Sequence, residues 1–238
     1  MSKAILMAAG RGTRLSRSIG SDCKCTLDIG GTTLIRHTVE MLLKFGIDVH
    51  IVTGYNKKLI YESLHSLPVT FHENVFYSIT NSLASLWFTR DIINGNDAII
   101  LGNADVFWEE DMLTVLLEDK RDAVMLCDSS RVEQGDYLFY VENEKVLGYG
   151  KFGDCNPANC EYVGLAKISG EMIPIFKNML IRMVEMQRHN GWWENVLYSM
   201  IPQRPIWAKD ISGQFWEEID FIEDYERILE YRRQRHAK

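Results

Sequence analysis

The sequence has few features that would direct the protein to a membrane or cross-link it. No apolar run approaches the roughly 20 residues of a membrane-spanning helix, and the run at the N-terminus is too short for a signal peptide. The five cysteines are odd in number and form no C-x-x-C pair, which argues against a zinc site and a disulfide framework. We therefore expect reduced thiols, no membrane span and a cytoplasmic protein.

An excess of positive charge is also lacking, because 26 Lys and Arg residues stand against 33 Asp and Glu residues. The formal net charge of −7 argues against a general role in binding nucleic acid. No Pro-, Gly- or Ser-rich linker and no internal repeat divides the 238 residues. The length and the 46% content of hydrophobic residues therefore predict one globular domain over residues 1–238, and the sequence carries no signal for an oligomeric state.

Against this acidic background, a cationic loop follows the first apolar run. Residues 4–9 have the length and composition of a buried strand, and residues 10–14 then read Gly-Arg-Gly-Thr-Arg. Glycine allows positive φ and close approach to a ligand, and successive N–H groups in such a turn form an anion-binding concavity. Arg14 and Lys24 add full charges for the same anion. The pattern predicts a polyphosphate-binding loop.

Two well-known phosphate loops are excluded here. The dinucleotide-binding fingerprint needs a third glycine at position 15, which is Leu15. The Walker loop ends in Gly-Lys-Ser/Thr, whereas this loop reads Gly12-Thr13-Arg14.

Strand and helix patterns alternate along most of the chain. We predict strands at residues 26–29, 48–53, 69–72, 98–101, 123–127 and 161–168, a hairpin at 137–149, and helices at 34–45, 57–65, 109–119 and 221–235. This order favours an α/β fold with a Rossmann-like, mixed but mostly parallel sheet flanked by helices.

Two aspartates follow predicted strands. The near-continuous apolar run at 98–101 suits a strand buried on both faces, and Asp105 follows it, where ligands bind in open α/β sheets. The alternative is a turn aspartate. Asp220 follows a short β-like run and precedes the last helix, so it could also be the N-cap of that helix.

The pattern L-x-A-A-G-x-G-T-R-L with a lysine ten residues after the arginine resembles the signature of the sugar-phosphate and phosphocholine nucleotidylyltransferases. One departure is Cys23, where that family usually has proline before the lysine. The resemblance implies a nucleotide-diphospho-sugar transferase type of fold, with a nucleotide-binding half (1–120) and an acceptor-binding half (121–238). It implies catalytic roles for Arg14, Lys24, Asp105 and Asp220, with the two aspartates binding Mg²⁺.

The resemblance also implies a set of nucleotide-binding residues. They are Ala8, Gly10, Gly12, Thr13, Arg14, Asn81, Ser85 and Asn103. The alternative for the segment around Asn81 is helix capping, by Asn81 or by Ser82.

The cues for the acceptor conflict. Trp193-Glu194-Asn195 resembles an element of the phosphocholine and phosphonate cytidylyltransferases, and an aromatic face with a carboxylate suits a quaternary ammonium. Glu161 and Gly164 instead match the E-x-x-G strand of sugar-selective relatives. We predict that Glu161, Gly164, Trp193 and Glu194 bind the acceptor, with core packing as the alternative for Trp192 and Trp193.

These features predict an Mg²⁺-dependent nucleotidylyltransferase. It would couple a nucleoside triphosphate, with CTP favoured, to a small phosphate or phosphonate such as phosphocholine, and release pyrophosphate. The alternatives are a sugar-1-phosphate nucleotidylyltransferase that uses UTP, GTP or dTTP, and a non-catalytic nucleotide-sensing module.

Overall fold

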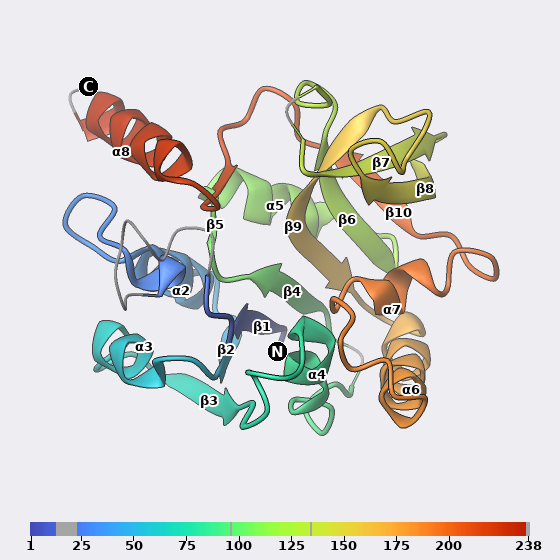
Figure 1. Ribbon diagram of the computed structural model, residues 1–238, viewed down its shortest axis with the longest axis horizontal. Helices are drawn as coiled ribbons and strands as arrows, with labels where there is room; N and C mark the ends of the chain where they lie inside the picture. The colour runs from blue at the N-terminus through green and yellow to red at the C-terminus, as the bar shows by residue number, and fades with distance from the viewer. Residues whose placement is uncertain (13–22, 96, 134, 237–238) are drawn as a thin grey trace.

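The computed structural model describes residues 1–12, 23–95, 97–133 and 135–236 (Figure 1). Thr13 and Arg14, both predicted to bind the nucleotide, lie outside these ranges. The strands of the large sheet are β1 (Lys3–Ala8), β2 (Asp48–Thr53), β3 (Val69–Glu73), β4 (Ile99–Asn103), β6 (Ala123–Asp128), β7 (Tyr137–Glu142), β8 (Lys145–Lys151), β9 (Cys160–Ile168) and β10 (Trp207–Asp210).

Helices cover both faces of this sheet. The described part of the chain contains the short 3₁₀ helix η1 (Lys24–Thr26) and the α-helices α2 (Leu34–Lys44), α3 (Lys57–Ser63), α4 (Ser82–Trp87), α5 (Glu110–Glu118), α6 (Met172–Glu185), α7 (Asn195–Tyr198) and α8 (Ile222–His236). Apolar side chains of α2, α3 and α5 pack on one face, and those of α4, α6 and α7 pack on the other (Figure 1). No helix in the described ranges is long and apolar enough to cross a membrane.

The sheet is mixed, with the order β3-β2-β1-β4-β9-β6-β10-β8-β7. β1 is parallel to β2 and β4, β2 to β3, and β6 to β10, whereas β9 is antiparallel to both β4 and β6. Every strand of the large sheet except β8 and β9 therefore points the same way. The predicted fold class is confirmed.

The first strand illustrates why the apolar runs were informative. Ala4, Leu6 and Ala8 of β1 belong to the core under α2, whereas Ile5 and Met7 belong to the core under α4 and α6. Side chains alternate between the two faces of a strand, so a strand covered on both faces reads as a continuous apolar run.

One predicted strand is wrong. Residues 26–29 form no strand; η1 ends at Thr26, and only a single bridge joins Asp28 to Thr33. The Asp28 carboxylate accepts hydrogen bonds from the N–H groups of Gly30 and Gly31, both of which have positive φ. A side chain that bonds to the nearby backbone in this way favours a turn over a strand ladder.

A small second sheet joins the segment before α8 to the residues that follow β4. β5 (Val106–Phe107) pairs antiparallel with β11 (Glu217–Glu218), and the N–H of Ile219 donates to the carbonyl of Asp105 at 2.9 Å. Ile219, which precedes α8, and Ile228, which lies in α8, then pack with Phe107 in a separate apolar cluster. This pairing sets the residue after Ile219 beside the end of β4.

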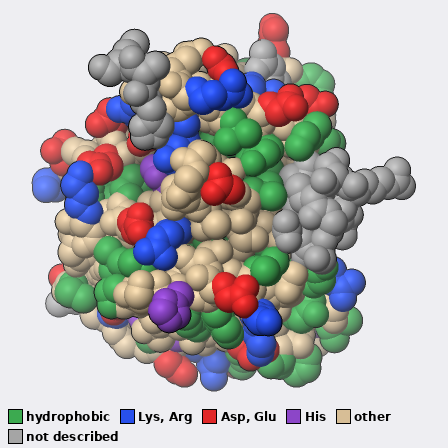
Figure 2. Space-filling view, turned by 90° about the vertical axis from the view of Figure 1, so that its left-hand side faces the viewer, with side chains coloured by type: hydrophobic (Ala, Val, Ile, Leu, Met, Phe, Trp, Pro, Cys, Tyr) green, Lys and Arg blue, Asp and Glu red, His purple; other side chains and the backbone are tan. Residues whose placement is uncertain are grey.

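The face of the molecule in Figure 2 carries acidic and basic side chains interspersed with apolar ones. A mixed surface of this kind suits an acidic globular protein, as the composition indicated.

Candidate functional site

A cavity of about 270 Å³ lies at the carboxyl ends of β1 and β4. Its centre is lined by Met7, Ala9, Gly10, Asn103, Asp105, Glu218 and Asp220. One side, here called the amide lobe, is lined by Asn74, Tyr77, Thr80, Asn81, Ser82 and Ser85. The other side, here called the aromatic lobe, is lined by Asp136, Tyr137, Glu161, Tyr162, Trp192, Glu194 and Tyr198. The position agrees with the ligand-binding edge of open α/β sheets.

Three of the four predicted catalytic residues meet at the centre of the cavity. The Lys24 ammonium, carried by η1, donates a short hydrogen bond to the Asp220 carboxylate and lies 3.6 Å from Oδ2 of Asp105. Burial lowers the pKa of Lys24, but Asp105 and Asp220 outweigh this and raise it above its ordinary value. Lys24 is therefore a cation held by two carboxylates. The fourth residue, Arg14, lies outside the described ranges.

Asp220 does not cap the last helix. The carboxylate of Asp224 accepts from the backbone N–H groups of Asp220 and Phe221, at 2.8 Å and 2.6 Å. The side chain of Asp220 is directed to Lys24 instead. The capping alternative for Asp220 is therefore wrong.

A third acid, Glu218, was missed by the sequence analysis. Its carboxyl lines the cavity, and burial, followed by the charges of Asp105 and Asp220, raises its pKa well above the ordinary value although Lys24 opposes the shift. Residues two apart share one face of a strand, so the β-like run before Asp220 contained the signal that Glu218 points the same way.

The glycines of the first loop act in different ways. Gly10 lines the cavity with open space where a Cβ would lie. Gly12 has φ +59°, and a Cβ there would lie 2.9 Å from Cγ of Lys24, so glycine is needed for the loop to approach the lysine stem. Ala8 packs into the core, and its neighbours Met7 and Ala9 form the wall.

Asn81 and Ser85 both line the amide lobe, as predicted for nucleotide-binding residues. Asn81 also caps α4, because its side chain accepts from the N–H of Ser82 at 2.8 Å. Ser82 is not the cap; its hydroxyl accepts from the N–H of Trp193 at 3.0 Å. Buried Ser85 accepts from the Asn74 amide at 3.0 Å. The capping and nucleotide-binding interpretations of Asn81 are thus compatible.

Asn103 connects the centre of the cavity to the Trp193-Glu194 turn. Its Oδ1 accepts from the indole N–H of Trp193 at 2.8 Å, and its Nδ2 lies 3.4 Å from Oε1 of Glu194. It lines the cavity as predicted, and it also ties the Trp193-Glu194 turn to the end of β4.

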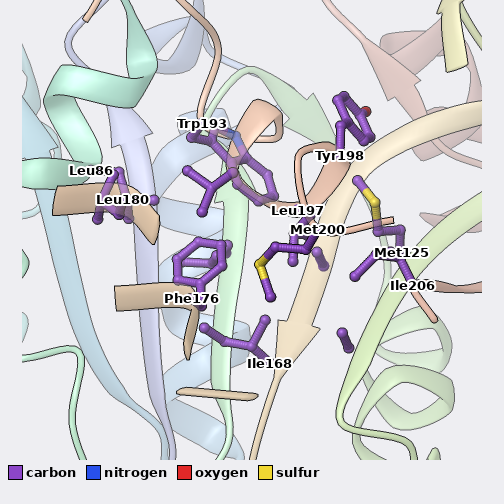
Figure 3. Close-up of a cluster of buried hydrophobic side chains, with 14 of the residues drawn as sticks. Leu86, Met125, Ile168, Phe176, Leu180, Trp193, Leu197, Tyr198, Met200 and Ile206 are labelled. Carbon is purple, nitrogen blue, oxygen red and sulfur yellow. The ribbon is translucent and has the colours of Figure 1, made fainter. Parts of the chain in front are cut away.

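The structure does not support contact between Trp193 and an acceptor. Trp193 is completely buried and lies with Phe176 and Leu197 in the core between α6, α7 and the sheet (Figure 3). Its neighbour Trp192 is 38% exposed, lines the aromatic lobe and meets the Tyr137 ring edge-on at 5.3 Å. Trp192 thus has the position that we predicted for Trp193, and the core-packing alternative applies to Trp193.

Gly164 also has a packing role. Its φ is +87°, and a Cβ there would lie 2.9 Å from Cγ2 of Val106 and 3.4 Å from Nδ2 of Asn103. Glycine at this position lets β9 pass close to the end of β4. Its contribution to acceptor binding stays a prediction.

Glu161 and Glu194 place two buried carboxyl groups in the aromatic lobe. Burial raises the pKa of Glu161 to about 7, although Arg131, whose Nε lies 3.1 Å away, opposes the shift. Burial raises the pKa of Glu194 to about 8, and its hydrogen bond with Asn103 reduces the shift. Both groups change charge near neutral pH, beside the stacked rings of Tyr137 and Tyr198.

Replacing Glu194 should stabilise the protein at high pH. A carboxyl whose pKa rises from 4.5 to about 8 on folding destabilises the fold increasingly as pH rises through that window, because the folded state retains a proton that the unfolded state releases. We expect Glu194→Gln to raise the melting temperature by about 3 °C or more at pH 8.5, and by much less at pH 5. Thermal unfolding at both pH values measures this. Exposed Glu185→Gln is the control, and equal shifts at the two pH values would contradict the prediction.

Comparison with known proteins adds a family and several relatives. Residues 4–181 match the family described as MobA-like NTP transferase domain. The chain is 25% identical to the CTP:phosphoglutamine cytidylyltransferase of Campylobacter jejuni over 95% of this chain and 99% of that protein. It is 24% identical to the 2-aminoethylphosphonate cytidylyltransferase of Lancefieldella rimae over 92% and 88%. The solved CTP:phosphocholine cytidylyltransferase of Streptococcus pneumoniae has the same fold, with a TM-score of 0.80 and 20% identity over 97% and 98% of the two chains.

Proposed function

Because the chain belongs to the MobA-like NTP transferase domain family, we propose that it is an Mg²⁺-dependent cytidylyltransferase whose acceptor is a small phosphate or phosphonate with a cationic amine. The observation that carries this proposal is the cavity itself. The pair of aspartates at its centre adjoins a lobe that combines buried carboxyl groups with aromatic rings.

The reaction needs positioning and charge neutralisation more than covalent chemistry. An acceptor oxygen would form a bond to the α-phosphorus of CTP while the bond from that phosphorus to the bridging oxygen breaks, and the electron pair leaves with pyrophosphate. In this proposal the amide lobe holds the nucleoside, and the loop at Gly10 and Gly12 holds the triphosphate. Lys24 supplies a positive charge to the phosphates, as Arg14 does in the sequence-based prediction.

The donor set at the centre fits Mg²⁺. This ion is bound in proteins by one or two carboxylates together with substrate phosphate oxygens, and Asp105 and Asp220 already share one cation, the Lys24 ammonium. Among the described residues no group of three or more His, Cys, Asp or Glu side chains could hold a metal, so substrate oxygens would complete the coordination. When bound, Mg²⁺ would neutralise charge that develops on the phosphate oxygens.

The aromatic lobe supports an amine-bearing acceptor. Trp192 and Tyr137 offer aromatic surface, and Glu194 offers a carboxylate once it loses its proton. A cation is attracted both to aromatic faces and to a desolvated carboxylate. The names of two relatives, which act on phosphocholine and 2-aminoethylphosphonate, agree with this chemistry.

A sugar-1-phosphate acceptor remains the second candidate, because Glu161 of the E-x-x-G element also lines the aromatic lobe. We also propose a cytoplasmic location, because the five cysteines are odd in number and form no C-x-x-C pair.

A substrate panel tests both candidates. Pyrophosphate release is measured with CTP, UTP, GTP and dTTP against phosphocholine, phosphoethanolamine, 2-aminoethylphosphonate and glucose-1-phosphate, with Mg²⁺ present. We expect release with CTP and an amine-bearing acceptor. If pyrophosphate is released only with glucose-1-phosphate and UTP or dTTP, the protein is a nucleotidylyltransferase whose acceptor is a sugar phosphate and not an amine-bearing phosphate. Release with no pair would contradict the proposal.

A further inference from the structure

The ammonium of Lys24 lies where a metal ion would have to bind. It is hydrogen-bonded to Asp220 and lies 3.6 Å from Asp105, and its side chain is only 10% exposed. Glu218 lines the same cavity, and the charges of Asp105, Asp220 and Lys24 all act on its carboxyl. The two aspartates that the proposed function assigns to Mg²⁺ therefore already share a protein cation.

We propose that Lys24 and the divalent cation compete for Asp105 and Asp220, so that metal entry releases Lys24 toward the triphosphate. The inference rests on the proposed function, because it takes these two aspartates as the metal ligands. Two cations within contact distance of the same pair of carboxylates repel each other, and the side chains of Asp105 and Asp220 are only 28% and 19% exposed, which limits screening by water. One must therefore leave when the other binds.

The construction of the site allows this exchange with little backbone movement. Lysine is a point charge on a flexible four-carbon stem. The stem of Lys24 lies against Gly12, whose absent side chain leaves room for it, and the same loop continues to Gly10 at the cavity wall. Rotation about the stem bonds can thus move the ammonium away from the aspartates along the loop that we assign to the triphosphate.

The exchange couples the two ligands. Without nucleotide, Lys24 holds the aspartates and opposes metal binding. A bound triphosphate gives Lys24 another anion to pair with and so frees the aspartates. The triphosphate therefore strengthens metal binding in two ways, by this release and by coordinating the ion with its own oxygens. By linkage, the metal strengthens nucleotide binding by the same factor.

The test is Mn²⁺ binding to the nucleotide-free protein, measured by titration calorimetry. We expect Lys24→Met to bind Mn²⁺ with a Kd about tenfold lower than that of the wild type, because the competing charge-assisted bond is gone. The control, Lys44→Met, removes the same charge from a surface ion pair with Glu110 and should leave the Kd unchanged. An unchanged or higher Kd for Lys24→Met, or an equal drop in both variants, would overturn the proposal.

A second measurement uses the wild type and so does not depend on the folding of a variant. An amine-acylating reagent is applied with and without Mn²⁺, and the rate of modification of Lys24 relative to Lys44 is followed by peptide mass spectrometry. We expect Lys24 to react several-fold faster with Mn²⁺. An equal or slower rate overturns the competition.

Asp105→Asn separates this inference from the proposed function. If Asp105→Asn binds Mn²⁺ as the wild type does, the proposed metal site is wrong and the competition fails with it. If Asp105→Asn loses Mn²⁺ binding while Lys24→Met binds as the wild type does, the metal site stands and only the competition is wrong.

Discussion

Asp105→Asn should lower the turnover of nucleotidyl transfer by about 10³-fold, the scale on which loss of one preorganised electrostatic group acts. The residue lies just beyond β4, after Asn103 and Ala104, and its carboxylate faces the Lys24 ammonium across 3.6 Å at the centre of the cavity. Asparagine keeps the shape but lacks the negative charge that a divalent cation needs. Steady-state pyrophosphate release with saturating CTP, acceptor and Mg²⁺ measures the effect.

Stability should change little in the same variant. Asp105 attracts Lys24 but repels Glu218 and Asp220, so removing its charge has opposing effects, and no cavity is created. Asp91→Asn, on an exposed turn outside the lining of the cavity, is the matched control and should retain full activity. Turnover within tenfold of the wild type in Asp105→Asn would mean that Asp105 is not a metal ligand.

The core strands and their polar ends could be predicted because burial on both faces leaves a direct trace in the sequence. The apolar runs of β1 and β4 are such traces, and parallel neighbours bring Gly10 and Asp105 to the same edge. The meeting of Lys24, Asp105 and Asp220 is different. It depends on the pairing of β5 with β11, two strands of two residues each. The β-like run before Asp220 indicated β11 but not its partner, so only the family resemblance indicated the meeting.

The sequence pattern could not predict which of the two adjacent tryptophans, Trp192 and Trp193, is buried. The resemblance to the cytidylyltransferases assigned the acceptor to Trp193 beside Glu194, but the turn before α7 decides which ring enters the core. In that turn the Trp192 N–H bonds to the Asn195 side chain, while the Trp193 N–H bonds to Ser82 and its indole to Asn103. The two partners of Trp193, Ser82 and Asn103, lie 111 and 90 positions away in the sequence, so tertiary contacts override the local pattern.

Glu194→Gln should raise the KM for phosphocholine by about 100-fold at pH 9, the scale for removing one partner of a buried charge pair. At pH 7 the same substitution should raise the KM for phosphocholine only about tenfold. The reason is that the pKa of Glu194 is raised to about 8 by burial, so at pH 7 the wild-type carboxyl is mostly protonated and must release a proton before it can pair with the cation. The wild-type KM should therefore fall about tenfold from pH 7 to pH 9, and that of the variant should stay flat.

Phosphocholine makes this pH profile interpretable. Its quaternary ammonium does not titrate, and a phosphate monoester is already almost fully ionised above pH 7. Glu161, with a pKa of about 7, changes the KM for phosphocholine at most about twofold over the same range, so Glu161→Gln should keep most of the wild-type slope.

The KM for CTP should not follow the pH profile, because Glu194 lies in the aromatic lobe. A wild-type KM for phosphocholine that does not change between pH 7 and pH 9, or a slope lost in Glu161→Gln and kept in Glu194→Gln, would remove Glu194 as the group that pairs with the acceptor's cation.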